Sequence, residues 1–165
     1  MIVNRSTYID QLIRSKGNGL IKIITGLRRS GKSFLLKKLF RQHLLDDGIK
    51  EDHIIIIDME SRKNKPFKDP DYLLDWVEKE MKDDDTYYII IDEVQEVNDF
   101  VEVLSTLSVT EGTDVYVTGS NSRFLSSDVV TEFRGRGDEI HVWPLSFKEF
   151  MSVFPGSKED AWSAY

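Results

Sequence analysis

The feature that most constrains the fold lies in residues 20–33, where an apolar segment leads into a glycine-framed loop and then into a helical pattern. Residues 20–25 are predicted to form a buried strand, and apolar residues recur at helical spacing from Ser33 onward. The loop between them, Gly26-Leu27-Arg28-Arg29-Ser30-Gly31-Lys32-Ser33, fits the pattern G-x-x-x-x-G-K-[ST] at every fixed position. A strand, this loop and a helix in that order predict a phosphate-binding loop of the P-loop type.

Each fixed residue of the loop has a chemical reason to be there. Gly26 and Gly31 allow the tight backbone path that turns successive N–H groups inward, and the positive end of the following helix adds to the field felt by a phosphate. We expect Lys32 to reach the β- and γ-phosphates and Ser33 to offer its hydroxyl to Mg²⁺. The predicted nucleotide-binding segment comprises Gly26, Leu27, Arg28, Arg29, Ser30, Gly31, Lys32, Ser33 and Phe34. Arg28 and Arg29 occupy variable positions, so they either contact the nucleotide or a neighbouring subunit, or point to solvent.

The rest of the chain alternates short apolar segments with helical patterns, which is typical of a parallel sheet with crossover helices. Further strands are predicted at residues 53–58, 87–91, 114–118 and 139–142. Helices are predicted around residues 8–13, from Ser33 onward, around residues 72–81 and at residues 100–107. The polar residues 60–70 are interpreted as a loop, and residues 83–85 as a solvated acidic connection rather than a metal site. We therefore expect an α/β fold.

Two carboxylates, Asp92 and Glu93, follow the apolar segment at residues 87–91. P-loop ATPases hold magnesium and orient water with such a pair. Asp92 is predicted to ligate Mg²⁺, or to accept from a water on it, opposite Ser33, and Asp58 or Glu60 is the alternative carboxylate. Glu93 is predicted to polarise the attacking water near the γ-phosphate. A glutamate in that role favours hydrolysis over transfer to a bound acceptor.

Small polar groups and two arginines complete the set of candidate catalytic residues. Ser120 or Asn121, after the strand at residues 114–118, could hydrogen-bond the γ-phosphate or the attacking water, and a polar turn is the alternative. Arg134 and Arg136 flank Gly135, where a guanidinium could reach the phosphates of a neighbouring subunit, and a surface loop is equally consistent. The histidines are assigned to helix-surface or strand positions because none has partners at metal-ligand spacing: His43, His53 and His141.

Charge limits the classes of partner. The net charge is −7, so we do not expect nucleic acid to bind this segment alone. Residues 1–48 nevertheless hold ten Lys and Arg against three Asp and Glu, which concentrates positive potential around the phosphate motif. Lys37 and Lys38 belong to this basic region, either as part of the phosphate field or as a solvated helix face.

Two further absences in the sequence bear on location and chemistry. The chain of 165 residues has no cysteine, which excludes disulfides and thiol chemistry. No apolar segment approaches the ~20 residues of a membrane span, and the first residues do not open a signal peptide. We therefore expect a cytoplasmic protein without a membrane partner.

Beyond the general motifs, the sequence resembles the AAA-type ATP-binding proteins of bacteria and archaea, in which a nuclease-like C-terminal region follows the ATPase domain. The matching residues are 25–33, Ile91-Asp92-Glu93-Val94-Gln95, residues 118–122, Gly135-Arg136 and Pro144-Leu145-Ser146-Phe147-x-Glu149-Phe150. The last of these is the most family-specific. The resemblance implies a three-layer sandwich with a parallel five-stranded sheet of order 5-1-4-3-2 and helices on both faces, ATP as ligand, and the Ser or Asn after strand four as sensor.

The same resemblance implies a division of the chain and a reaction. Residues 1–19 are expected to be a helical lead-in, residues 20–154 the P-loop ATPase core, and residues 155–165 the start of a truncated extension, so that the helical lid and C-terminal domain are missing partners. The expected function is hydrolysis of ATP to ADP and phosphate with Mg²⁺, weak in this segment alone and assisted by self-association if an arginine acts in trans. A nucleotide-gated switch or scaffold with negligible turnover is the alternative.

Overall fold

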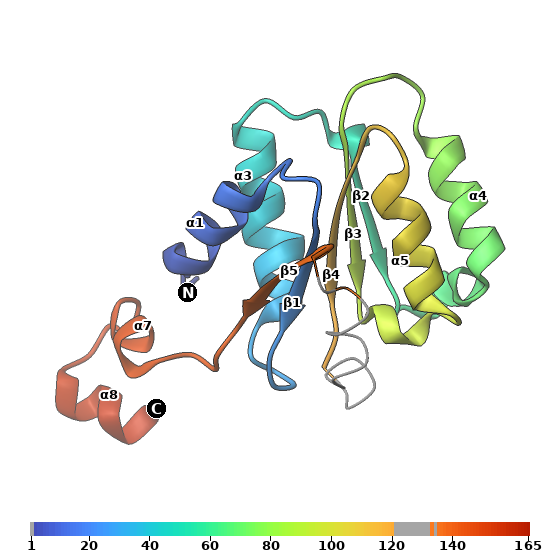
Figure 1. The fold of residues 1–165 in the computed structure, drawn as a ribbon. Coiled ribbons are helices and arrows are strands. Elements are labelled where there is room, and N and C mark those ends of the chain that lie inside the picture. The colour runs from blue at the N-terminus through green and yellow to red at the C-terminus, as the bar shows by residue number, and fades with distance from the viewer. Residues whose placement is uncertain (1, 121–132, 134) are drawn as a thin grey trace.

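The computed structural model describes residues 2–120, 133 and 135–165, which form a sheet of five strands flanked by helices (Figure 1). The strands are all parallel and lie in the order β2-β3-β4-β1-β5. Their bounds are β1 Ile21–Thr25, β2 Ile54–Asp58, β3 Tyr87–Asp92, β4 Thr113–Thr118 and β5 Gly137–His141. The isoleucine segments of β2 (residues 54–57) and β3 (residues 89–91) are apolar on both faces, as a covered parallel sheet requires. The predicted α/β fold and the strand order 5-1-4-3-2 are confirmed.

Helices precede the sheet, connect its strands and follow it. Helix α1 is Ser6–Ser15, and α2 (Lys32–Phe34) runs through a π-helical segment, Leu35–Phe40, into α3 (Arg41–Asp46). Helices α4 (Pro70–Glu80) and α5 (Phe100–Val109) are crossovers, and α7 (Phe147–Met151) and α8 (Lys158–Ala164) follow β5. Short 3₁₀ turns cover Glu51–His53, Arg62–Lys68 and Val94–Glu96.

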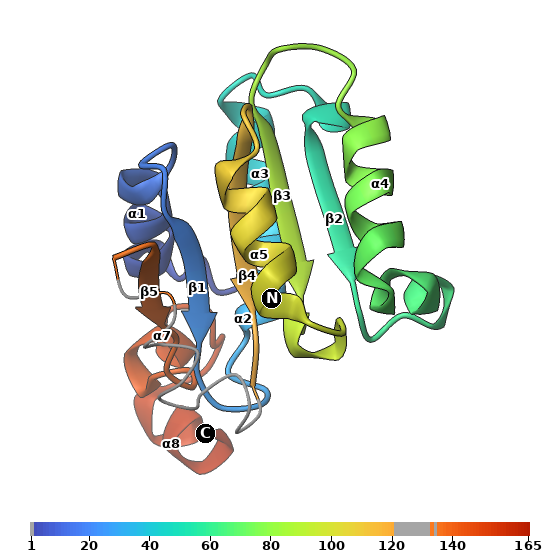
Figure 2. The same cartoon turned by 45° about the vertical axis from the view of Figure 1, so that its right-hand side comes forward.

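The helices lie on both faces of the sheet, which confirms the three-layer arrangement (Figure 2). Helices α4 and α5 cover one face, where Leu73 and Leu104 pack against Ile57 and its neighbours. Helix α1 and the helix of residues 32–46 cover the other face, where Phe40 is part of a second core. Because side chains alternate along a strand, successive isoleucines of β2 enter the two cores in turn.

The predicted loop over residues 60–70 is wrong at its centre, because Arg62–Lys68 forms a 3₁₀ helix. Phe67 anchors this segment: it is buried, and its ring centroid lies 4.9 Å from that of Trp76 and 5.4 Å from that of Tyr72 on α4. One aromatic residue among polar neighbours creates no periodicity in the sequence, so the segment has the composition of a loop.

Parallel strands bring the functional candidates to one edge of the sheet. Asp58 and Asp92, the last residues of β2 and β3, are register partners, and Thr118 ends β4 beside Ile24 of β1. The segment after β1 begins the phosphate loop. The carboxyl ends of four neighbouring strands therefore bring the main groups of the site described below to one place.

Helices α7 and α8 lie beside the sheet rather than on it (Figure 1), and the sequence patterns did not predict them. Each begins with a reciprocal capping box, Ser146 with Glu149 and Ser157 with Asp160. Phe147 holds the pair together, with its ring centroid 4.8 Å from that of Trp162. Of the helices that the structure describes, none combines the length and apolar character needed to cross a lipid bilayer.

A lysine lies fully buried in the middle of the sheet. Lys22 on β1 forms an ion pair with Asp114 on β4, and its ammonium lies 5.0 Å from the ring centre of Tyr116. Asp114 also accepts from the Tyr116 hydroxyl at 2.7 Å and from the Gly17 N–H at 3.0 Å. Burial raises the pKa of the Tyr116 hydroxyl, so this group donates as a neutral phenol. The cluster joins β1 to β4 by charge as well as by the strand ladder.

Removing only the charge of Asp114 should destabilise the fold strongly. Asp114→Asn keeps an oxygen for Tyr116 and Gly17 but leaves the Lys22 ammonium buried without a counter-charge, which is expected to cost about 3–5 kcal/mol. Urea unfolding followed by circular dichroism measures this. Adding Lys22→Met should recover most of the loss, and a cost below about 1 kcal/mol for Asp114→Asn alone would contradict the pairing.

Candidate functional site

The phosphate loop joins the end of β1 to the start of α2, and its backbone path needs glycine at both fixed positions. The φ angle is 136° at Gly26 and 93° at Gly31, values that other residues rarely adopt. A Cβ at Gly26 would lie 2.2 Å from the carbonyl oxygen of Val142, so that position is also closed by the chain that follows β5. The backbone conformation therefore requires glycine at both positions, whether or not a ligand binds.

The loop also carries two groups that could bind an anion, the Lys32 ammonium and the Ser30 hydroxyl. Lys32 is 4% exposed, and its Nζ donates to the carbonyl oxygens of Gly26 at 3.0 Å and Leu27 at 2.8 Å. Burial lowers the pKa of this ammonium, and the nearby charges of Glu93 and Asp92 oppose that shift only in part. The Oγ of Ser30 is buried and, among the residues the structure describes, has no hydrogen-bond partner. A desolvated cation and an unused hydroxyl at the start of a helix fit a group with several anionic oxygens.

Asp92 lies at the centre of the site and is fully buried. Its Oδ1 accepts from the Ser33 hydroxyl at 2.8 Å and from the Thr118 hydroxyl at 2.6 Å. Ser33 and Asp92, predicted as the magnesium pair, are therefore in direct contact. Hydroxyl and carboxylate oxygens are the donor set that Mg²⁺ prefers, so the residues present fit that ion.

Glu93 is held in a strained backbone position beside this pair, with φ 57°. Its N–H donates to the Thr118 hydroxyl at 2.9 Å, and its carboxylate accepts from Ser120 at 3.1 and 2.9 Å and from the Gln95 amide. A hollow of about 520 Å³ opens in front of Glu93, lined also by Arg28, Met59, Glu60, Glu96 and Ser120. Of the two predicted sensor residues, Ser120 thus meets Glu93, and Asn121 lies outside the described residues.

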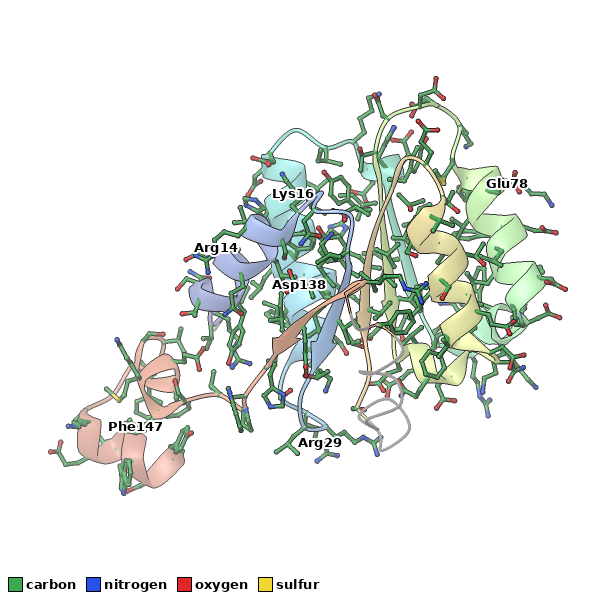
Figure 3. The ribbon with its side chains drawn as sticks, in the orientation of Figure 1. Arg14, Lys16, Arg29, Glu78, Asp138 and Phe147 are labelled. Atoms are coloured by element: carbon green, nitrogen blue, oxygen red, sulfur yellow. The ribbon has the colours of Figure 1, made fainter. Side chains whose placement is uncertain are left out.

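Four residues of the nucleotide-binding segment, Leu27, Arg28, Arg29 and Phe34, are exposed, whereas Ser30 is buried. The exposed fractions of Leu27 and Phe34 are 62% and 42%. Figure 3 shows Arg29 at the far end of the loop, away from the sheet. Arg28 lines the hollow in front of Glu93, and Arg29 does not.

Arg136, one of the two late arginines, is not brought to the loop of its own chain. Arg136 precedes β5, and Gly137 pairs with Ile21 at the start of β1, whereas the loop follows the end of that strand. At ~3.3 Å per residue, the strand separates Arg136 from the loop by roughly 16 Å. Arg134 lies outside the described residues. A role in trans for either arginine stays a prediction.

Arg5 contacts the phosphate loop, and the sequence patterns did not predict this contact. Its side chain is almost fully buried and donates to the Ser30 carbonyl of the phosphate loop at 2.6 Å, to the Trp143 carbonyl at 2.7 Å and to Glu149 at 3.1 Å. It therefore ties the loop to the segment after β5. No sequence pattern links residues 5, 30, 143 and 149, so these contacts could not be predicted from the sequence. Glu149 does belong to the family-specific motif at residues 144–150.

A second charged cluster lies at the opposite edge of the sheet, before β2. His53 is buried and stacks on Tyr87, its Nδ1 lies 2.8 Å from Asp52, and its Nε2 lies 2.9 Å from Asp83. Hydrogen bonds to Asp52 and Asp83 outweigh burial and raise the pKa of His53. The side chains of Asp83 and Asp85 are exposed, as expected for a solvated connection, and both also approach this histidine.

The chain is similar in sequence to a known family and to a longer bacterial protein. A family model described as an AAA domain matches residues 18–151. An uncharacterized protein of Haemophilus influenzae is 37% identical over 151 residues, which cover 91% of this chain and 38% of that protein. The chain thus spans less than half the length of this curated relative.

Solved structures share the fold at low sequence identity. Caenorhabditis elegans PCH-2 aligns with a TM-score of 0.58 and 21% identity, covering 88% of this chain and 44% of that chain. AMPPCP-bound DnaA from Aquifex aeolicus aligns with a TM-score of 0.55 and 16% identity, covering 98% of this chain and 55% of that chain. At these identities the likeness shows the fold alone.

The Arg5 contacts make a prediction about the mobility of the loop. Arg5→Lys keeps the charge but cannot serve two carbonyls and a carboxylate at once, so it should cost about 1–3 kcal/mol of stability and speed amide exchange in residues 26–31 by roughly tenfold or more. Hydrogen exchange by mass spectrometry measures the loop directly. Arg14→Lys on α1 (Figure 3) is the matched control, and unchanged exchange in Arg5→Lys would show that the loop is held without Arg5.

Proposed function

The chain belongs to the AAA domain family, and from that premise we propose that it binds ATP with Mg²⁺ and hydrolyses it to ADP and phosphate. The observation that carries this proposal is the contact between the phosphate loop and the acidic strand end, made by Ser33 and Asp92 across 59 residues of sequence. Glu93 follows at once, in position to act on water. The structural neighbour DnaA was solved with AMPPCP, an analogue of ATP, which supports a nucleoside triphosphate as ligand.

In this proposal the loop holds the triphosphate through its N–H groups and through Lys32. On binding, Lys32 exchanges the carbonyl oxygens of Gly26 and Leu27 for the β- and γ-phosphate oxygens, which is favourable because a desolvated ammonium gains an anionic partner. Ser33 and Asp92 would hold Mg²⁺, which would neutralise phosphate charge when bound. Thr118 keeps Asp92 oriented through its hydroxyl.

Glu93 is the proposed general base. Its carboxylate accepts a proton from the attacking water, and it is a stronger base once its hydrogen bonds from Ser120 and Gln95 are released. Ser120 is then free to donate to the γ-phosphate or the water, the role predicted for a residue after β4. When Ser120 binds the γ-phosphate, it gives up its hydrogen bond to Glu93, so the presence of the γ-phosphate frees the carboxylate to act as a base.

The same contacts favour a second candidate function, a nucleotide-gated switch with negligible turnover. Both oxygens of the Glu93 carboxylate are occupied by neighbours from the chain itself. If they remain so when nucleotide binds, the site senses ATP without hydrolysing it. Turnover, rather than affinity, separates the two functions.

Glu93→Gln is the decisive variant. It should lower steady-state phosphate release by about 10²–10⁴-fold and leave ATP affinity nearly unchanged, because an amide cannot take the proton. Calorimetry gives the affinity, and Glu78→Gln on α4 (Figure 3) is a remote control. Release that is equally slow in the wild type and in Glu93→Gln, with tight ATP binding, would favour the switch.

Lys32→Ala should weaken the binding of ATP more than the binding of adenosine, because the lost charge faces only the β- and γ-phosphates. Calorimetry with both ligands measures the two affinities. Equal losses of affinity would mean that the substitution had damaged the fold.

Self-association is the remaining proposal, because Arg136 cannot reach the loop of its own chain. An arginine supplied by a neighbouring copy can raise phosphoryl-transfer rates by ~10³–10⁵, so activity per molecule should rise with protein concentration. Mixing Arg136→Ala with Lys32→Ala should restore part of the activity that each lacks alone, and Arg134→Ala is tested in the same way. A rate per molecule that stays flat, without rescue in the mixture, would leave both arginines with a local role.

A further inference from the structure

Lys37 makes contacts that neither interpretation of the sequence anticipated. It lies one helical turn after Ser33, within the π-helical segment Leu35–Phe40. Its ammonium lies 2.7 Å from Oδ2 of Asp92 and 2.7 Å from Oδ2 of Asp58. Lys37 is thus neither a solvated lysine nor a ligand placed in the phosphate loop. It bridges the carboxylates at the ends of β2 and β3.

Asp92 depends on this bridge for its charge balance. The other oxygen of its carboxylate accepts only from the uncharged hydroxyls of Ser33 and Thr118, and the side chain is 1% exposed. A buried carboxylate without a counter-charge is strongly disfavoured. Asp58 adds a second negative charge, because it is the register partner of Asp92 on the adjacent strand. The ammonium keeps these two carboxylates together.

Lys37 remains charged in this position. Both carboxylates lie at ion-pair distance from its Nζ, and opposite charges at that distance favour the ammonium form of a lysine. With the lysine, the three groups sum to one negative charge. Without it they would present two carboxylates and the Ser33 hydroxyl with two negative charges, an oxygen cluster that attracts a divalent cation by itself.

We propose that Lys37 is a positioning residue that keeps divalent cations off Asp92 in the nucleotide-free protein, so that metal binding requires the phosphate oxygens of the nucleotide. The inference deepens the proposed Mg²⁺-dependent ATP site and rests on it for the role of the nucleotide. When no nucleotide is bound, the Lys37 ammonium balances part of the negative charge of Asp58 and Asp92. It also holds Asp92 with Oδ1 turned toward Ser33 when nucleotide and metal arrive together.

The test measures metal binding without nucleotide. Mn²⁺ is titrated into nucleotide-free protein and followed by calorimetry and by the electron paramagnetic resonance of free Mn²⁺, with Mg²⁺ as competitor. Lys37→Met, which keeps much of the side-chain volume and removes the charge, should bind Mn²⁺ at least about tenfold more tightly than the wild type. Lys38→Met, the same change on the exposed neighbour, should behave as the wild type, and Lys37→Arg should still exclude the ion.

The location of the new metal site is tested in the same titration. Adding Asp92→Asn to Lys37→Met should abolish the extra Mn²⁺ binding. Persistence of that binding would place the ion elsewhere, for example at His53, Asp83 and Asp85, and would overturn the inference. Equal Mn²⁺ affinity in the wild type and in folded Lys37→Met would overturn it as well.

A second variant covers the case in which Lys37→Met does not fold. Asp58→Asn removes one carboxylate and retains the lysine, so it should raise the Mg²⁺ concentration needed for half-maximal binding of a fluorescent ATP analogue by about tenfold. No rise would contradict the bridge. Failure of the wild type to bind that analogue at any Mg²⁺ concentration would instead reject the proposed function, while the nucleotide-free Mn²⁺ titrations would still report on Lys37.

Discussion

The carboxylate of Asp92, which has no contact with solvent, joins the separate parts of this molecule. Strand β3 carries it, Ser33 reaches it from the start of α2, Thr118 reaches it from the end of β4, and Lys37 reaches it from the next turn of the helix. A charge in that position is stable only while these donors surround it. The start of α2, the end of β4 and the lysine that also contacts the end of β2 therefore meet at one buried anion.

Much of this arrangement could be predicted from the sequence, because its local patterns agree with one another. The glycine-framed loop between an apolar strand and a helix predicted the phosphate site, and Asp92 and Glu93 followed a strand that belonged in the same sheet. Continuous isoleucine and valine indicated strands covered on both faces, and the structure confirms their order. These features depend on neighbours within a few residues, where spacing carries structural information.

The contacts that were missed depend on residues far apart in the chain. Arg5 meets Ser30, Trp143 and Glu149, and Lys37 meets Asp58 and Asp92, through packing that no periodicity records. Charged residues on a helix or before a strand usually face solvent, so a composition-based interpretation assigns them there. Arg5 and His53 were therefore underrated for the same reason. Whether a charged side chain is buried depends on how the surrounding helices and strands pack, so it can be recognised only from the three-dimensional structure.

The strand order has a consequence for how the protein emerges from the ribosome. Strand β1 is made first, yet both of its neighbours in the sheet, β4 and β5, are made last. At roughly 5–20 residues per second, the interval between Thr25 and Thr118 lasts on the order of 5–20 s, during which β1 has no partner on either side. Strands β2 and β3 can pair within that interval. The candidate nucleotide site, which begins at the end of β1, is thus completed only late in synthesis. Until then β1 is an exposed apolar strand, and a chaperone would be expected to bind the nascent chain there.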